Sequence, residues 1–165
     1  MRVLVCFGGS DPHGVTERLA SGLSDGSAWV ATAIVGSHHR PLEPLSIEVV
    51  RDPVDLAERL ADCDLAVLGG GTMKFEAACL GRAAVLVGAA DDQLAVGPPF
   101  AATGAAIWLG DGRTIEPRVV RETLDGLAAD GERRRAIASR ASKVVDGLGA
   151  ERLADAILDL APATA

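Results

Sequence analysis

The stretch LAVLGGGTMKFEAACLG, residues 65–81, decides the fold of this 165-residue chain. It opens with four apolar residues, which predict a short buried strand, and passes through three glycines and a threonine into a run of good helix formers. A strand, a glycine turn and a helix in this order place several backbone N–H groups and the positive end of a helix dipole at one point. The stretch therefore predicts an anion-binding turn.

A second junction of the same kind lies near the start of the chain. The apolar run Val3–Phe7 predicts a strand, and the turn GGSD at 8–11 follows it. This turn lacks the third glycine of the dinucleotide fingerprint and the Gly-Lys-Ser/Thr of a Walker loop. Two interpretations of this turn stay open. In the first, the backbone N–H groups of the turn and the Ser10 hydroxyl contact a phosphate or sugar. In the second, the segment is only a tight turn in which Asp11 caps the next helix.

Strand-like and helix-like segments alternate along nearly the whole chain. Strands are expected at 3–7, 29–35, 47–50, 65–68, 84–87 and 106–109. Helices are expected at 14–23, at 72–80, within 91–103, and from 116 to 160 with breaks near 131 and 147–149. A further helix is expected to begin after Asp52, its predicted N-cap, and Gly81 is expected to close the helix at 72–80. Pro98 and Pro99 should interrupt the helix within 91–103.

This alternation predicts βαβ units and therefore a parallel sheet. We expect residues 1–165 to form a single α/β domain, a Rossmann-like doubly wound six-stranded parallel sheet flanked by helices. In such sheets ligands bind beyond the carboxyl ends of the strands. Both glycine junctions lie at such ends and can share one crevice.

Composition narrows the function classes. The net charge is −7 and the pI about 4.9, so the surface lacks the basic footprint that nucleic acids and anionic membranes require. Backbone donors can still supply a local phosphate site. No apolar run reaches the roughly 18 residues of a membrane span. Three scattered cysteines without a paired spacing predict buried, reduced thiols, and with no visible signal peptide we expect a cytoplasmic protein.

Several polar residues near the glycine turns are candidate ligands. Three consecutive glycines exceed what a simple turn needs and let another group approach Gly70 and Gly71 closely. Thr72 can offer its hydroxyl to a phosphate oxygen. Glu76 lies one turn later on the same helical face, where it either binds a ribose or is an exposed helix carboxylate.

Other polar groups follow neighbouring strands. Asp92 and Gln93 come after the strand at 84–87 and either bind sugar hydroxyls or help to cap the next helix. His13 in the first turn is a candidate general base or phosphate donor, or an exposed loop histidine. His38 and His39 are adjacent and cannot share one face of a helix or strand, so the sequence predicts no metal site, and it predicts no cofactor.

These residues also carry a resemblance to a known family. The run FGGSDP at 7–12, the segment 70–72, Glu76, the segment 79–81 and the pair 92–93 resemble the carboxyl-terminal half of the UDP-sugar hydrolase of pseudaminic acid biosynthesis. More broadly, the chain is similar to the nucleotide-binding half of GT-B glycosyltransferases, including the enzyme that makes lipid II of peptidoglycan. The likeness runs from Val3 to about Leu160 and implies the carboxyl-terminal half-fold of GT-B enzymes with a UDP-sugar as substrate.

The resemblance assigns a set of residues to substrate binding. It places Gly9 and Ser10 beside the sugar–phosphate region, Gly70, Gly71 and Thr72 at the diphosphate, Glu76 at the ribose, Asp92 and Gln93 at the sugar, and the loop 50–52 at the uracil. The related hydrolases usually carry Asn-Gln where this chain has Asp92-Gln93. No family role transfers to His13, because the relatives vary there.

Members of this family also have an amino-terminal half with a catalytic histidine in a glycine-rich loop, and this chain begins within the second half. We therefore expect a UDP-sugar-binding domain of a glycosyltransferase or hydrolase that needs a complementary half, or a partner protein, and is not active alone. One wall of a cleft cannot exclude water or supply both the donor clamp and the base. The chain can be an excised domain, a subunit of a split enzyme or a free-standing protein. The alternatives are a non-catalytic interaction protein that keeps the fold, and a small enzyme that uses His13.

Overall fold

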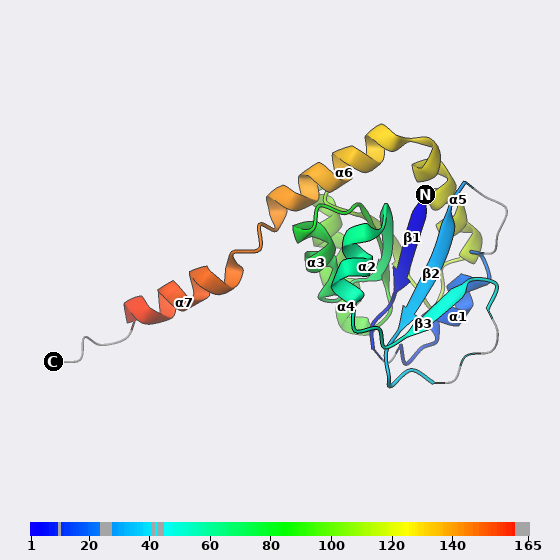
Figure 1. Cartoon of the computed structure of the whole chain (residues 1–165), viewed down its shortest axis with the longest axis horizontal. Coiled ribbons are helices and arrows are strands. Elements are labelled where there is room, and N and C mark those ends of the chain that lie inside the picture. Colours follow the sequence, from blue (N-terminus) through cyan, green and yellow to red (C-terminus); the bar gives the residue numbers. More distant parts are fainter. Residues whose placement is uncertain (10, 24–27, 41, 43–44, 161–165) are drawn as a thin grey trace.

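The computed structural model describes residues 1–9, 11–23, 28–40, 42 and 45–160. At its centre is a six-stranded sheet, shown in part in Figure 1, in the order β3-β2-β1-β4-β5-β6 with every pair of neighbours parallel. The strands are β1 (Arg2–Cys6), β2 (Val30–Val35), β3 (Glu48–Arg51), β4 (Leu65–Gly69), β5 (Ala84–Gly88) and β6 (Ile107–Asp111). This order reverses between β1 and β4, which is the doubly wound topology. The predicted fold class is confirmed.

Helices cover both faces of the sheet, because alternate side chains of each strand point to opposite faces. Val67 and Val85 belong to one hydrophobic core, and Leu68 and Leu86 to the other. Buried side chains of α1 and α5 join the first core, and those of α2, α3 and α4 join the second. These helices are α1 (Val15–Ala20), α2 (Leu56–Asp62), α3 (Met73–Cys79), α4 (Asp91–Ala102) and α5 (Pro117–Ala129).

Two further helices end the described chain. Helix α6 (Gly131–Val144) contributes Ile137 to the first core and Ala141 to the second, so it packs against both layers. Helix α7 (Gly149–Leu160) has no buried residue and points away from the sheet (Figure 1). The breaks predicted near 131 and at 147–149 are confirmed. Among the described residues, no helix combines the length and the apolar composition that crossing a bilayer requires.

The predicted N-cap of α2 is wrong. Asp52 has φ +46 and donates its N–H to the Val35 carbonyl, so it extends the edge of the sheet and lies before a turn. The helix begins at Leu56, after Asp55. The Asp-Pro pair at 52–53 predicted a helix start because it matches the local preference, but the hydrogen bond to the neighbouring strand determines the backbone there.

The predicted interruption of α4 is also wrong. The helix runs unbroken through Pro98 and Pro99, although each proline lacks the N–H that would bond to a carbonyl one turn earlier. The carbonyls that lack these donors belong to Leu94 and Ala95, which are half-buried and exposed, so water can bond to them. Gly97 faces inward against Trp108, and this packing holds the helix to β6.

The turn after β1 ends in a side-chain cap. Asp11 is buried with φ +38, and its two carboxylate oxygens accept the N–H groups of Val15 (3.0 Å) and Thr16 (2.6 Å). These bonds satisfy donors at the start of α1 that have no partner within the helix. The structure thus confirms the capping interpretation of Asp11. The helix ends at Ala20, three residues before the predicted end at Leu23.

The cysteines differ in exposure, which corrects the expectation that all three are buried. Cys6 and Cys63 are buried, and burial raises the pKa of both thiols, whereas Cys79 at the end of α3 is exposed. The thiolate is the reactive form of cysteine, so buried thiols with a raised pKa should react slowly. We therefore expect one fast-reacting thiol in the folded protein and three after unfolding. The rate of reaction with an aromatic disulfide reagent measures this. Cys79→Ser should abolish the fast phase. A fast phase that survives this substitution would contradict the assignment.

Candidate binding site at the two glycine junctions

The two glycine junctions lie side by side. Strands β1 and β4 are neighbours, with Cys6 opposite Leu68, so the turns that follow them leave the same edge of the sheet. A Cβ built on Gly69 would lie 3.4 Å from the carbonyl oxygen of Phe7. The two turns are therefore in contact, as the sequence analysis expected for a shared crevice.

A cavity of about 190 Å³ lies between these turns. Its lining residues are Cys6, Phe7 and Gly8 from the first junction, Gly69, Gly71, Thr72 and Met73 from the second, and Gln93 from α4. Typical ligand pockets have volumes of about 300–1,000 Å³, so this cavity can enclose a phosphate or diphosphate group but not a whole nucleotide-sugar. A larger ligand would extend over the open surface around it.

Gln93 supports the second glycine turn from α4. Its Oε1 accepts the N–H groups of Gly70 (2.8 Å) and Ala89 (3.0 Å). Since both donors require an acceptor, the oxygen must face them, and the amide nitrogen must point the other way. This Nε2 lies 3.5 Å from the Cβ position of Gly71, and both residues line the cavity. Gln93 therefore braces the turn and presents a donor to the cavity.

The three consecutive glycines have different roles. A Cβ on Gly69 or on Gly70 would come within 3.0 Å of Gln93 atoms, so these two glycines allow α4 to approach the turn closely. Gly70 is buried, its N–H is taken by Gln93, and it does not line the cavity. Gly71 does line it. Within the described part of the chain, no hydrogen bond engages the N–H groups of Gly71 and Thr72. These two donors are available to a ligand.

Lys74 is a residue that the sequence analysis missed. Its ammonium donates to the carbonyl oxygens of Gly70 and Gly71 (2.9 Å to Gly71) and lies 4.2 Å from the centre of the Phe75 ring. Lys74 is buried, and burial lowers its pKa. These two hydrogen bonds hold the carbonyl groups of the turn toward Lys74. The N–H groups of Gly71 and Thr72 are therefore favoured to point outward. A lysine in the first turn of a helix gave no signal, because most such lysines are exposed.

Glu76 lies outside the cavity. It is exposed on α3 and lines a shallow hollow of about 370 Å³ together with Phe75, Cys79 and Leu80 of the same helix and Ala57 of α2. The hollow and the cavity are both lined by α3 and by residues adjacent to it. A ligand held by Gly71 and Thr72 can therefore extend along α3 toward Glu76.

Neither Asp91 nor Asp92 caps α4, because Ala90 occupies the N-cap position and no side chain forms a capping hydrogen bond there. Instead Asp91 forms an ion pair with Arg113 (2.7 Å), which also holds Asp111 at the end of β6. Asp92 is exposed at the start of the helix. In the first junction Gly9 is exposed with open space at its Cβ position, while Ser10 lies outside the described residues.

His13 is exposed in the loop before α1 and does not line the cavity. It lies near Asp111, and its charge is one minor cause of the lowered pKa of that carboxyl group, after the larger effect of Arg113. The structure therefore brings Gly71, Thr72 and Gln93 together but leaves His13 on the side of β6.

A larger cavity, of about 460 Å³, lies elsewhere, over β1 and β2 beside α2. Arg2, Val30 and Thr32 line it on the sheet, and Asp55, Glu58 and Asp62 line it at the start of α2 and along that helix. It faces the side of the sheet, away from the carboxyl ends of the strands where ligands of such sheets bind. The smaller cavity at the glycine junctions remains the better candidate.

Comparisons with known proteins match the chain to about half the length of each relative. No model of a known protein family matches the chain. The spore coat polysaccharide biosynthesis protein SpsG of Bacillus subtilis strain 168 is 24% identical over 169 residues, which cover 96% of this chain and 50% of SpsG.

The fold matches solved structures of glycosyltransferases. MurG of Acinetobacter baumannii superposes with a TM-score of 0.78 at 20% identity, over 97% of this chain and 50% of MurG. The spinosyn rhamnosyltransferase SpnG gives a TM-score of 0.72 at 22% identity, over 95% of this chain and 44% of SpnG. The chain thus has the fold of one half of the GT-B glycosyltransferases and spans about half the length of these relatives. The broader resemblance noted in the sequence is confirmed at the level of the fold.

Proposed function

We propose that this domain binds a UDP-sugar and serves as the nucleotide-binding half of a glycosyltransferase or UDP-sugar hydrolase. The observation that carries the proposal is the cavity between the two glycine turns, which Gln93 helps to line and where the N–H groups of Gly71 and Thr72 have no hydrogen-bond partner among the described residues. Converging neutral donors of this kind bind phosphate groups without a basic surface. The likeness to SpsG and to the glycosyltransferase structures supports the same proposal.

In this proposal each part of the ligand has its own group of residues. The diphosphate accepts hydrogen bonds from Gly71, Thr72 and Gln93. The ribose hydroxyls donate to the exposed carboxylate of Glu76, farther along α3. The sugar lies toward Asp92 and toward Gly9 of the first turn, and the resemblance assigns Ser10, which is outside the described residues, to the same part of the ligand. Gly70 acts indirectly, because its N–H and its carbonyl are already bonded to Gln93 and Lys74.

Catalysis in this proposal requires a complementary half. The cavity encloses no more than the phosphates, so the sugar and the bond to be broken lie on an open surface. Bulk water at that surface weakens the electrostatic interactions that stabilise a transition state. A second wall, from another part of the polypeptide or from a partner protein, would close the cleft and add the catalytic base. Whether the acceptor is water, as the resemblance to the pseudaminic acid enzyme suggests, or a second sugar depends on that wall.

Titration calorimetry with UDP tests the proposal. The domain should bind UDP, and Glu76→Gln should weaken binding roughly 10- to 100-fold, because a hydrogen bond to a charged group contributes about 1.5–3 kcal/mol. Glu151→Gln, an equivalent change on exposed α7, should leave the affinity unchanged. Absence of binding at millimolar UDP by the folded protein would contradict the proposal, and an unaltered affinity of Glu76→Gln would contradict the role of Glu76.

A further inference from the structure

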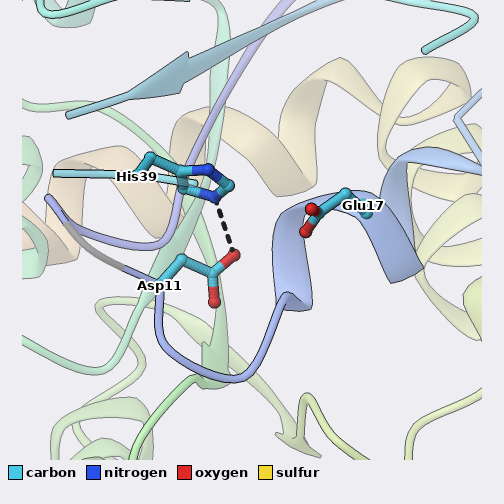
Figure 2. A group of neighbouring side chains, drawn as sticks. All are labelled: Asp11, Glu17 and His39. Carbon is cyan, nitrogen blue, oxygen red and sulfur yellow. Dashed lines mark ion pairs between the residues drawn. The ribbon is translucent and has the colours of Figure 1, made fainter. Parts of the chain in front are cut away.

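Three titratable side chains form a cluster beside the first glycine turn, outside the cavity. Asp11 belongs to the loop between β1 and α1, Glu17 to α1, and His39 to the segment after β2 (Figure 2). One oxygen or nitrogen atom of each side chain lies within 4.8 Å of the corresponding atoms of the other two. The cluster therefore joins two loops that are far apart in the sequence.

The tautomer of His39 follows from its surroundings. The side chain is fully buried, and Nδ1 lies 2.9 Å from the carbonyl oxygen of Arg40. A carbonyl oxygen only accepts, so Nδ1 carries the hydrogen and the neutral ring presents a lone pair at Nε2. This atom points toward Asp11 Oδ2 at 3.6 Å, beyond hydrogen-bond distance, and it has no hydrogen-bond partner among the described residues. A buried lone pair that faces a carboxylate is unfavourable unless a proton or a metal ion lies between the two groups.

Glu17 adds a second unpaired atom to the cluster. Its Oε1 accepts a hydrogen bond from Arg40 Nε at 2.9 Å, whereas its Oε2 is buried and, within the described part of the chain, lacks a partner. A proton on Nε2 of His39 would satisfy Asp11 but would leave this oxygen unpaired. A divalent cation can contact all three atoms at once, and its charge matches the two carboxylates.

The geometry points to a binding site for a divalent transition-metal ion, with Asp11 Oδ2, Glu17 Oε2 and His39 Nε2 as ligands and Zn²⁺ as the best-fitting ion. Zinc binds nitrogen and oxygen ligands at about 2.0–2.2 Å, and tetrahedral coordination then places two ligands roughly 3.3–3.6 Å apart. The Nε2–Oδ2 distance of 3.6 Å fits this spacing. The three atoms lie within 4.8 Å of one another, so an ion would draw the most distant pair together by at most about 1.5 Å. The imidazole ligand favours zinc over calcium or magnesium.

The surrounding structure holds the ligands in place before an ion arrives. Arg51 donates to the carbonyl oxygens of His39 (2.9 Å) and Gly36 (3.2 Å), which fixes the segment that carries the imidazole. The backbone N–H groups of α1 hold Asp11. Because the Asp11 and His39 side chains are fully buried, the site has little room for a substrate. The ion would link the loop after β1 to the segment after β2 and stabilise the domain.

Metal titration of the full chain tests this inference, after treatment with a chelator. Zn²⁺ should bind with one ion per chain and raise the melting temperature. His39→Gln and Glu17→Gln should each lower the Zn²⁺ affinity at least about 100-fold, since even the loss of an outer contact costs 10- to 100-fold. His38→Gln, which changes the exposed neighbouring histidine, is the matched control and should bind as the unmodified chain does. Circular dichroism checks that each variant is folded.

Co²⁺ provides a spectroscopic test of the ligand set. Bound Co²⁺ should show ligand-field absorption without the intense near-ultraviolet charge-transfer band of a thiolate ligand, because the proposed site contains no cysteine. The inference is overturned if the folded chain binds neither ion, if His39→Gln binds Zn²⁺ as tightly as the unmodified chain, or if His38→Gln loses affinity equally. A thiolate band that accompanies tight binding would likewise overturn it, by assigning the ion to a cysteine.

Discussion

Gln93→Leu should destabilise the domain by at least about 2 kcal/mol, because a leucine of similar size has no acceptor for the N–H groups of Gly70 and Ala89. Both residues are buried, and an unpaired buried donor costs roughly 1–3 kcal/mol. The same substitution removes the amide donor beside Gly71 and releases the turn. The affinity for UDP should therefore fall more than about 10-fold, which corresponds to 1.4 kcal/mol. Urea unfolding and calorimetry measure the two effects.

Gln93→Glu separates these two effects. The carboxylate retains an oxygen acceptor for both N–H groups, so the free energy of unfolding should stay within about 1 kcal/mol of the original value. Its second oxygen replaces the donor on the cavity side and repels an anionic ligand, so UDP binding should be lost. If Gln93→Leu were as stable as the unmodified chain, Gln93 would not brace the turn. If Gln93→Glu bound UDP normally, the cavity would not hold the diphosphate.

Gly97→Ala and Gly126→Ala should change stability in opposite directions, although each replaces a helical glycine with alanine. A Cβ on Gly97 would lie 2.2 Å from Cζ3 and 2.6 Å from Cε3 of Trp108. The ring is packed against the second core, so helix or ring must move, at a cost of roughly 1–3 kcal/mol. Gly126 is exposed on α5 with nothing within 4 Å of its Cβ position, so alanine should gain about 0.5–1 kcal/mol there.

Urea unfolding measures both free energies, and tryptophan fluorescence adds a local readout. The chain has two tryptophans, and a Cβ on Gly97 would overlap Trp108, so Gly97→Ala should shift the emission of the folded protein. A Cβ on Gly126 meets no atom within 4 Å, so Gly126→Ala should leave the emission unchanged. Stabilisation by both substitutions would show that helix propensity outweighs the overlap at Trp108. That result would contradict the close packing of Gly97 in α4 against Trp108 in β6.

The six strands could be predicted from the sequence because each is a short apolar run bounded by turn residues. β4 is the clearest example, since all its residues are buried between two layers of helices and the run therefore carries no polar alternation. The parallel, doubly wound arrangement could be predicted from the alternation of strand and helix, whereas the order of the strands came from the structure. The ends of elements were less predictable. At Asp52 a hydrogen bond to β2 overrode the capping preference. At Pro98 and Pro99 the helix continues with both rings exposed, while Gly97 and Phe100 pack inward.

The position of the candidate site could be predicted from the sequence, but the hydrogen bonds and contacts within it could not. Gly71 and Thr72 follow a buried strand, and their role could be read from local order alone. That Gly69 and Gly70 make room for Gln93 could not, because the contact joins residues 23 positions apart. The burial of Lys74 and the cluster of Asp11 with His39 likewise depend on how separate loops meet, for which one sequence contains no periodic or spacing signal.

The placement of α6 has a consequence for how the chain is made. Ile137 and Ala141 lie one helical turn apart, yet each belongs to a different side of the sheet. During synthesis, the core surfaces that Ile137 and Ala141 cover stay exposed on both sides of the sheet until residues 131–144 have left the ribosome. Apolar surface exposed in this way promotes aggregation of a partly made chain.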